Sequence, residues 1–326
     1  MCTAMAYRTG SGYYFGRTLD LECSYGEQVV VMPRRFPLDY RLQRRCEEHF
    51  AMVGVAAVRG GYPLYYEAVN EHGLAMAGLN FPGYAHYGSV EDEDGRDRTA
   101  PFELIPWILS QCRDVGEARE QLLRLRLCRL DFDAALPLTP LHWMLSDGSR
   151  SIVYEPMATG ARVLDNPVEV LTNAPDFCYH MTHLCDYAGL RAEEPGEGAF
   201  GAVLQPYSRG MGAMGLPGDA SSASRFIRAA FVKANAVAGS DGADAVGQFF
   251  HMMDTVAVPR GCVRLRGGEM PLTVYTSCYD LLQGVWYYTT YENRSIRAVE
   301  LRRCAPDGGR LSIYSMAGGE TVTVQN

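Results

Sequence analysis

The chain has 326 residues, of which 47% are hydrophobic, so it is long enough to bury a large core. Its formal charge of -8 argues against a nucleic-acid-binding protein, because such proteins usually carry a basic surface. The longest apolar stretch, residues 51–58, is far shorter than the roughly 20 residues of a membrane-spanning helix. The ten cysteines are scattered and the N-terminus has no secretory signal pattern. We therefore expect one domain, residues 1–326, with reduced thiols in a bacterial-type cytoplasm.

The first predicted elements are two strands, residues 2–8 and 13–19, joined by a glycine-rich turn. In an antiparallel hairpin with this turn, paired residue numbers sum to about 21, so Cys2 lies opposite the end of the second strand. Arg17 and Asp20 flank that position. A thiol, a guanidinium and a carboxylate are therefore predicted to converge at one end of the hairpin, although a slip of one residue would reverse the faces.

Cys2 becomes the N-terminal residue once Met1 is removed. The freed α-amine has an unperturbed pKa of about 7.7–8.0, so it can take the proton of the thiol on the same residue. An adjacent amine is a recognised way to activate a nucleophilic side chain. Taken alone, a cysteine at position 2 is more often an ordinary thiol, and the residues that follow it favour the catalytic interpretation. With Met1 attached, the amine is blocked and the chain is expected to be inactive.

The remainder of the chain combines strand-like and helix-like segments. Strands are expected at 28–32, 51–58, 74–80, 141–146, 151–155, 162–164, 168–172, 273–279, 285–291, 296–301 and 311–315. Helices are expected at 101–112, 114–127, 224–235 and 243–253, the third of them capped by Ser221 or Ser222. Residues 91–99 and 192–218 are predicted loops. This order predicts an α+β fold of layered sheets with helices packed outside.

Two patterns that suggest a cofactor or a metal lack the required context. Residues 210–215 match the dinucleotide pattern G-x-G-x-x-G, but no apolar strand precedes them and no helix follows. Cys178, His180, His183 and Cys185 are closely spaced, yet on a helix the cysteines would lie about 20° apart and the histidines on the opposite face. We therefore expect no cofactor and no metal.

Polar residues at the ends of apolar segments are better candidates for chemistry. Asn80 and Asn173 each end a strand and precede a proline by two residues, which suits either an oxyanion hole or a turn. Arg225 lies near the start of a helix, where a positive charge is unfavourable unless a specific partner or solvent compensates it. His142 lies in the apolar segment LHWMLSD and is interpreted as a satisfied core histidine rather than a general base.

Taken together, segments from almost the whole chain resemble the choloylglycine hydrolase family, which comprises bile salt hydrolases and penicillin V acylases among the N-terminal nucleophile hydrolases. The matching segments are MCT at the start, FGRTLD, NEHGLAMAGLNFP, LHWMLSD, VLTNAP, GLPGDASSASRFIRAAF, YTSC and YYTTYEN. The resemblance implies a four-layer αββα sandwich, an amidohydrolase acting on linear amides, and a homotetramer.

The resemblance also implies a role for each polar residue singled out above. Cys2 would be the nucleophile and its α-amine the base. Arg17 and Asp20 would hold the thiolate and the amine, Asn80 and Asn173 would serve the oxyanion hole and orientation, and Arg225 would support the thiol.

The substrates implied are conjugated bile salts, joined to glycine or taurine. Asn80 favours them over penicillin V, since penicillin V acylases tend to have tyrosine at that position. The aromatic residues expected to form the walls of a steroid pocket lie in predicted loops: Tyr62 to Tyr66, Phe132, Phe200 and Tyr207.

Family members differ in conjugate preference at the segment that contains Tyr207, Ser208 and Arg209, the expected substrate-binding residues. Arg209 would pair with the anion of the conjugate, and we expect a weak preference for glycine conjugates. An acyl transfer to other amines would be a side activity. The alternatives are a penicillin V acylase and a non-catalytic binding protein on the same fold.

Overall fold

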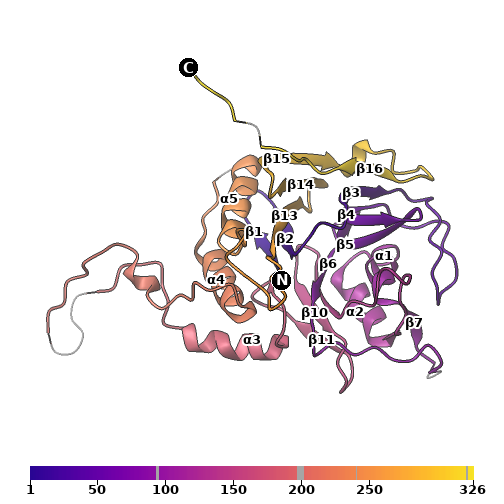
Figure 1. The fold of residues 1–326 in the computed structure, drawn as a ribbon, viewed down its shortest axis with the longest axis horizontal. Helices are drawn as coiled ribbons and strands as arrows, with labels where there is room; N and C mark the ends of the chain where they lie inside the picture. Colours follow the sequence, from indigo (N-terminus) through magenta and orange to yellow (C-terminus); the bar gives the residue numbers. More distant parts are fainter. Residues whose placement is uncertain (93–94, 197–201, 240, 321) are drawn as a thin grey trace.

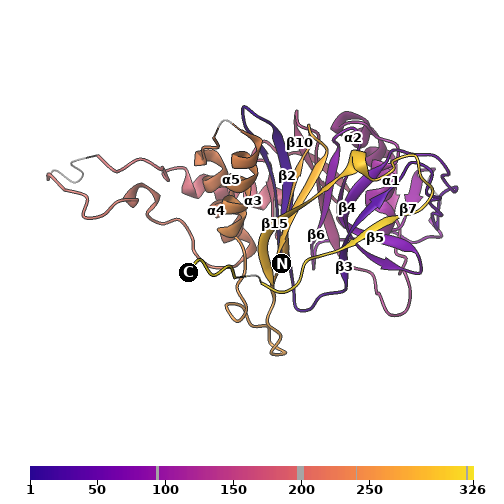
Figure 2. The same cartoon turned by 90° about the horizontal axis from the view of Figure 1, so that it is seen from above.

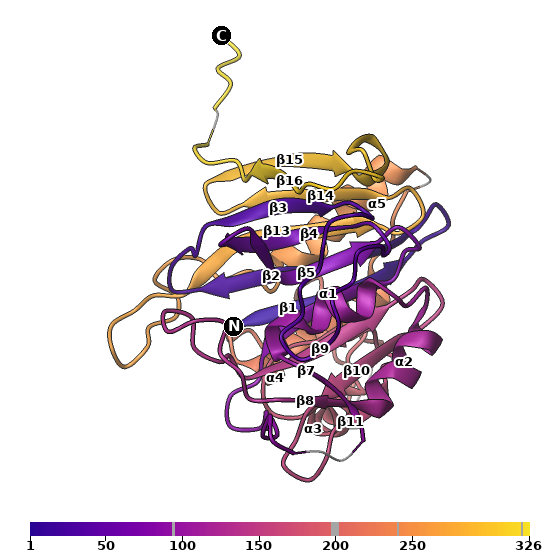
Figure 3. The same cartoon turned by 90° about the vertical axis from the view of Figure 1, so that its right-hand side faces the viewer.

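The computed structural model describes residues 1–92, 95–196, 202–239, 241–320 and 322–326. Two antiparallel sheets pack face to face, and helices cover the outer face of each sheet (Figures 1 and 2). The order of layers is therefore helix, sheet, sheet, helix, which confirms the expected four-layer αββα sandwich. Strands of the two sheets run in similar directions, as in aligned sheet packing (Figure 3).

The first sheet has six strands among the described residues. In spatial order they are β12 (Val170–Leu171), β1 (Cys2–Arg8), β2 (Tyr13–Leu21), β13 (Leu272–Asp280), β14 (Val285–Thr290) and β15 (Asn293–Glu300). Strands β1 and β2 are buried along almost their whole length, because one face meets the second sheet and the other meets helices. Cys2 therefore starts an interior strand of the sandwich.

The second sheet has eight strands in the described part of the chain. In spatial order they are β11 (Arg162–Asp165), β10 (Ser151–Glu155), β9 (Leu141–Ser146), β6 (Ala75–Asn80), β5 (Tyr62–Asn70), β4 (Met52–Arg59), β3 (Glu27–Met32) and β16 (Ser312–Ser315). Their inner faces supply small and branched side chains, including Val53, Val69 and Ala77, to the core between the sheets. Strands β6 and β9 are neighbours, which brings Asn80 and His142 close together.

Most of the helices begin where a side chain caps the first turn. Those on the second sheet are α1 (Leu104–Leu109), which follows the 3-10 turn η1 (Pro101–Glu103), and α2 (Val115–Arg124). Those on the first sheet are α3 (Phe177–Leu184), α4 (Ser222–Asn235) and α5 (Gly242–Asp254). Asp114, Asp176, Ser221 and Asp241 accept hydrogen bonds as N-caps of α2, α3, α4 and α5. None of the helices in the described ranges is long and apolar enough to cross a membrane.

The register of the first hairpin is as predicted. Cys2 lies opposite Leu19, Thr3 opposite Thr18 and Ala4 opposite Arg17, so paired numbers sum to 21. Because side chains alternate between the two faces of a strand, Cys2, Ala4 and Arg17 share one face. Asp20 lies on the other face, toward the helices.

Three local predictions were wrong. The helix expected over 114–127 ends at Arg124, because the next residues alternate buried Leu125 and Leu127 with Arg126 and form strand β8 (Leu125–Leu127). Strand β8 pairs in parallel with β7 (Asp97–Thr99), which lies in the expected charged loop.

The third error concerns the aromatic segment from Tyr62 to Tyr66. It is the start of β5 rather than a loop, and a β-bulge interrupts its pairing, since Val55 faces Glu67 while Ala56 faces Tyr65. The bulge leaves Tyr66 as an extra residue whose carbonyl is free of the ladder.

In the described part of residues 185–221 the regular elements are the short turns η2 (Cys185–Tyr187) and η3 (Met211–Ala213), and this part extends away from the body of the molecule (Figures 1 and 2). The loop expected at 192–218 is confirmed for its described residues, and Gly210–Gly215 are not followed by a long helix. Phe200 lies outside the described residues. One further turn, η4 (Leu301–Arg303), follows β15.

Candidate active site

Cys2 is 3% exposed and lies at the end of the first hairpin, between two buried arginines. Its backbone nitrogen donates a hydrogen bond to Asn173 Oδ1 at 2.8 Å. Its carbonyl accepts one from Arg225. The hairpin end is further closed by Met1, whose nitrogen donates to the carbonyl of Asp20 at 2.8 Å. The expected nucleophile is therefore held through its backbone, which leaves the thiol for chemistry.

Arg17 reaches from β2 across the gap between the sheets. Its Nη1 donates to the carbonyls of Gly78 at 2.6 Å and of the bulged Tyr66 at 3.3 Å, and its Nε donates to Thr18 O at 3.2 Å. Its Nη2 is buried and has no hydrogen-bond partner in the described part of the chain. Glu67 Oε2 lies 3.4 Å from Nε. Arg17 is thus fixed in place with one N–H group left unused.

The charges around Arg17 outweigh the cost of burying it. Burial by itself lowers the pKa of Arg17, but the charges that Cys2, Tyr275 and Glu67 carry once they are ionised raise it above its ordinary value. Burial raises the pKa of Glu67 to about 7, although Arg17 opposes that shift. Cys2 is the first of these acidic groups, so the thiol and the guanidinium are electrostatically coupled.

Asp20 lies on the opposite face of β2, beside the chain's N-terminus. Its Oδ1 accepts a hydrogen bond from Thr273 Oγ1 at 2.6 Å, and the side chain is fully buried. Burial raises the pKa of Asp20, while the charges of Arg225 and the N-terminal amine act to lower it. Asp20 is therefore placed to interact with a positive amine at this end of the hairpin.

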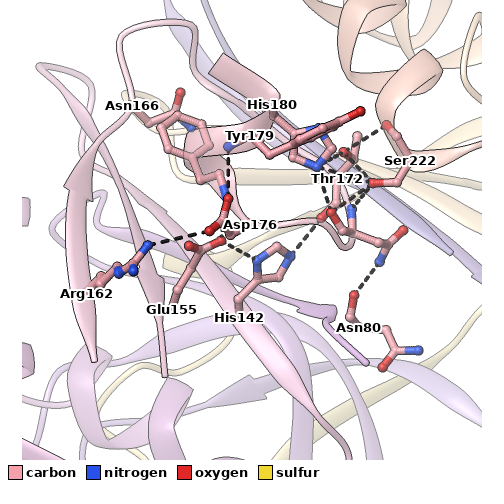
Figure 4. A network of polar contacts seen from close by, with 12 residues as sticks. Asn80, His142, Glu155, Arg162, Asn166, Thr172, Asp176, Tyr179, His180 and Ser222 are labelled. Carbon is pink, nitrogen blue, oxygen red and sulfur yellow. Dashed lines mark hydrogen bonds and ion pairs between the residues drawn. The ribbon is translucent and has the colours of Figure 1, made fainter. Parts of the chain in front are cut away.

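Asn173, just after β12, joins the other groups of the site. Its Oδ1 accepts hydrogen bonds from Cys2 N at 2.8 Å and from Arg225 Nη2 at 2.7 Å. Its Nδ2 donates to the carbonyl of Asn80 at 2.8 Å (Figure 4). One amide thus connects the start of β1, the end of β6 and helix α4, a role well beyond that of a turn residue.

Arg225 lies in the first turns of α4 and is fully buried. Besides Cys2 and Asn173, it donates to Thr3 Oγ1 at 2.7 Å and to Ala220 O at 3.1 Å. Burial lowers its pKa, which Asp20 and Cys2 oppose. The specific partner expected for an arginine at this position of a helix is present.

Asn80 ends β6 and is exposed. Its carbonyl accepts from Asn173, whereas its own amide makes no hydrogen bond to any described residue. A free amide donor on a fixed strand end beside a buried thiol suits an oxyanion hole, which needs donors aimed at developing charge.

A second set of polar groups, not identified from the sequence, supports Asn173 from behind. Ser222 Oγ donates to Asn173 O and accepts from Asn173 N, both at 2.8 Å. His180 Nε2 donates to the same carbonyl at 2.8 Å, and burial lowers the pKa of His180 to about 4. His142 is fully buried with both ring nitrogens bonded, as expected of a satisfied core histidine. Figure 4 shows these groups arranged around the chain that follows β12.

The expected substrate-binding residues are not part of this cluster within one chain. Tyr207, Ser208 and Arg209 lie on the extended segment, and Tyr207 is 83% exposed. Of the expected aromatic walls, Tyr62 packs against Phe132, with ring centroids 6.0 Å apart.

The close-spaced cysteines and histidines near α3 point in different directions. His180 is buried toward Asn173, whereas Cys178 and Cys185 are exposed. Within the described ranges, no group of three or more His, Cys, Asp or Glu side chains is arranged to hold a metal ion.

The four-layer αββα sandwich is the fold of the N-terminal nucleophile hydrolases. Residues 2–314 match the model of the family described as linear amide C-N hydrolases, choloylglycine hydrolase family. The chain belongs to this family, and it is an amide-cleaving hydrolase.

Individual relatives agree with this assignment. A protein of Lactiplantibacillus plantarum named bile salt hydrolase/transferase is 43% identical over 317 residues, which cover 97% of each chain. The structure is similar to that of a C2A mutant of conjugated bile acid hydrolase from Clostridium perfringens, with a TM-score of 0.93, 34% identity and full coverage of both chains. Penicillin V acylase from Agrobacterium tumefaciens shares the fold, with a TM-score of 0.77 and 16% identity, over 98% of this chain and 95% of that one.

Proposed function

We propose that this enzyme cleaves the amide bond between a steroid acyl group and glycine or taurine in conjugated bile salts, with Cys2 as the nucleophile. The observation that carries the proposal is the position of Cys2, whose nitrogen lies 2.8 Å from Asn173 Oδ1, whose carbonyl accepts from buried Arg225, and whose side chain shares a face of the hairpin with buried Arg17. The 43% identity to a bile salt hydrolase/transferase supports the substrate class.

In the proposed first step, removal of Met1 converts the nitrogen of Cys2 into an α-amine, which takes the thiol proton. The thiolate attacks the amide carbon, and the carbonyl electron pair moves to oxygen. Asn80, with its free amide donor, stabilises that oxyanion together with backbone N–H groups. Arg17 stabilises the thiolate before attack, and Asp20 stabilises the protonated amine.

In the second step, the α-amine returns the proton to the leaving nitrogen, the C–N bond breaks, and glycine or taurine departs. The steroid acyl group remains as a thioester on Cys2. Water, deprotonated by the same amine, then releases the bile acid and restores the thiol. If another amine attacks the thioester in place of water, the product is a new amide, which is the proposed transferase side activity.

Substrate selection is proposed to come from two regions. Asn80 favours bile salts over penicillin V as substrates. Arg209 is proposed to pair with the anion of the conjugate, with a weak preference for glycine. Because Arg209 lies on the extended segment, a neighbouring copy of the chain is the natural place for that contact.

We further propose that the protein is a single domain that works as a homotetramer in the bacterial cytoplasm. The family match over residues 2–314 supports a single domain. Light scattering would measure the mass of the particle, and a monomeric mass would contradict the tetramer.

The decisive experiment compares glycocholate, taurocholate and penicillin V as substrates of the protein, after intact mass has verified that Met1 is absent. We expect the enzyme to cleave both bile salts, glycocholate at least as fast as taurocholate. Cleavage of the penicillin V side-chain amide should be slow by comparison. Cys2→Ala should abolish release of glycine and Cys2→Ser should reduce it strongly. Continued glycine release by Cys2→Ala would overturn the mechanism, and a penicillin V preference would overturn the substrate.

A further inference from the structure

We propose that His142 and Glu155 form a positioning pair, which holds one proton between the two side chains and fixes both strand ends of the site. The inference rests on the proposed function, because the strand ends in question carry Asn80 and Asn173. Neither residue of the pair touches Cys2, so its effect is on the geometry of groups that do.

The ring of His142 contacts the chain on both sides of the site. His142 lies on β9 opposite Leu79, the residue before Asn80. The ring of Phe81, the residue after Asn80, stacks on the imidazole with centroids 4.1 Å apart and an interplanar angle of 7°. The other side of the imidazole reaches the chain of Asn173, because Nε2 lies 2.8 Å from Thr172 O (Figure 4). A single rigid ring therefore spaces the two asparagines.

The hydrogen bonds of His142 also fix its proton count. A carbonyl oxygen only accepts, so Nε2 must carry a hydrogen that it donates to Thr172 O. Nδ1 lies 3.2 Å from Glu155 Oε1, which also accepts from Phe177 N at 2.9 Å. If the ring is neutral, Nδ1 is bare and Glu155 must donate a proton to it. If the ring is charged, Nδ1 donates to the carboxylate. In both cases one proton lies between Nδ1 and Oε1.

His180 provides an internal contrast. It also donates from Nε2 to a backbone carbonyl, that of Asn173, but its Nδ1 is buried with no partner among the described residues. Burial lowers the pKa of His180 to about 4, so this ring stays neutral near neutral pH. Two histidines thus donate to the adjacent carbonyls of Thr172 and Asn173. Of the two rings, that of His142 has an acidic side chain next to its Nδ1.

Other charges reach this region from three packed elements. His183 and Arg225 act on His180 from α3 and α4, and Asp176, the N-cap of α3, pairs with Arg162 at 3.5 Å. None of these side chains forms a hydrogen bond or an ion pair with Nδ1 of His142. Glu155, on β10, is fully buried and is the group that meets this nitrogen.

The test is the variant Glu155→Gln. Glutamine has nearly the size of glutamate, but its side chain cannot share a proton with His142. The glutamine oxygen must accept from Phe177 N, so it faces the bare Nδ1 of a neutral ring and repels it. Once the ring is protonated, Nδ1 donates to that oxygen and the contact is restored. Protonation of the ring therefore relieves the repulsion, so the defect should shrink as the pH falls.

We expect kcat on glycocholate to fall about tenfold or more relative to wild type near pH 7.5, and the deficit to be smaller near pH 5.5. KM should change little, since the pair lies behind the site. Glu120→Gln, an exposed glutamate on α2, is the matched control and should follow wild type at both pH values. A deficit equal at both pH values, or a change confined to KM, would overturn the inference.

A second measurement does not depend on how Glu155→Gln folds. The second measurement is NMR of Cys2→Ala protein with 15N-labelled histidine. The signals of His142 are assigned as those that disappear in His142→Gln. We expect this ring to carry a hydrogen on Nε2 and to have a hydrogen-bonded Nδ1. A ring protonated only at Nδ1, or one that titrates as in solution, contradicts the shared proton. If the wild-type protein cleaves no bile salt, the proposed function is wrong. The NMR measurement then still tests whether His142 and Glu155 share a proton.

Discussion

Two fully buried arginines reach Cys2 from opposite faces of the first sheet, and they are held differently. Arg17 spends its hydrogen bonds on backbone carbonyls of β2, β5 and β6 and leaves Nη2 without a partner in the described part of the chain. Arg225 donates its hydrogen bonds to Cys2, Thr3, Asn173 and the carbonyl of Ala220, which precedes its helix. Arg17 is thus anchored elsewhere and offers charge to the site, whereas Arg225 ties parts of the site together.

The pKa values of the two arginines shift in opposite directions, which agrees with this difference in their contacts. The pKa of Arg225 is lowered because burial dominates, and that of Arg17 is raised because surrounding negative charges outweigh burial. An arginine stays charged in either case. Acids act on both residues, Asp20 and Cys2 in the case of Arg225, but of the two it is Arg17 that has a carboxyl group, that of Glu67, at 3.4 Å. The comparison predicts an electrostatic role for Arg17 and a clamping role for Arg225.

The largest effect is expected from Arg17→Met, which removes the charge and keeps most of the volume. Without the guanidinium, the thiolate of Cys2 is less stable, so the thiol should need a higher pH to react with iodoacetamide. We expect kcat/KM for glycocholate to fall about 100-fold or more. An unchanged pH dependence of alkylation would contradict the electrostatic role.

Arg225→Met should have a smaller effect of a different kind. It removes the links from α4 to Cys2, Thr3 and Asn173, so we expect about a tenfold loss of kcat/KM and a lower melting temperature. The pH dependence of alkylation should move less than in Arg17→Met. Arg228→Met on the same helix, where Arg228 donates to Thr255 O and Pro217 O, is the matched control. If both arginine variants shift the alkylation profile equally, the contrast between them is wrong.

The hairpin and the two asparagines could be predicted because their signals are local. Antiparallel register follows from the turn, and it placed Arg17 and Asp20 near Cys2 without any knowledge of the rest of the fold. The four-layer order also followed, from the succession of strands and helices and from the resemblance to the family. These features need no contact between distant parts of the chain.

The supporting groups could not be predicted because they depend on distant contacts. Glu67 lies in β5, whose start was taken for an aromatic loop, since the bulge at Tyr66 breaks the alternation that identifies a strand. Ser222 was considered only as a helix cap, yet it bonds the backbone of Asn173, 49 residues away. His142 was correctly expected to be satisfied, but its partners Thr172 and Glu155 lie on other elements.

Glu67→Gln tests the acid beside Arg17 through stability. Folded Glu67 keeps its proton to about pH 7, whereas the unfolded side chain loses it near its ordinary value of 4.5. The folded state therefore binds more protons between these values, so this stabilisation is complete below about pH 4.5 and is lost as the pH rises through 7. The glutamine has no such loss. The free energy of unfolding of the variant, relative to wild type, should rise from about pH 5 to about pH 8 by on the order of 1–3 kcal/mol.

Urea titrations at the two pH values measure that difference, with Glu120→Gln as the exposed control. A difference that stays constant with pH would mean that Glu67 is ionised over the whole range and acts as a fixed counter-charge of Arg17. The comparison of the two arginines would then rest on geometry alone.

Thr273→Val should have the smallest effect, because it removes one hydrogen bond from the Asp20 side of the hairpin. The hydroxyl of Thr273 donates to Asp20 Oδ1 at 2.6 Å and so favours the ionised carboxylate, whose pKa burial has already raised. Without this donor the pKa of Asp20 rises further, and the carboxylate is protonated at a higher pH. If Asp20 must be ionised to stabilise the α-amine of Cys2, kcat/KM should fall about fivefold, and the acid limb of its pH profile should move upward. Thr276→Val, at a buried threonine on the same strand, should leave that limb in place. If the acid limb of Thr273→Val does not move, Asp20 is not the group whose protonation lowers activity at low pH. The loss would then come from protonation of the Cys2 thiolate beside Arg17.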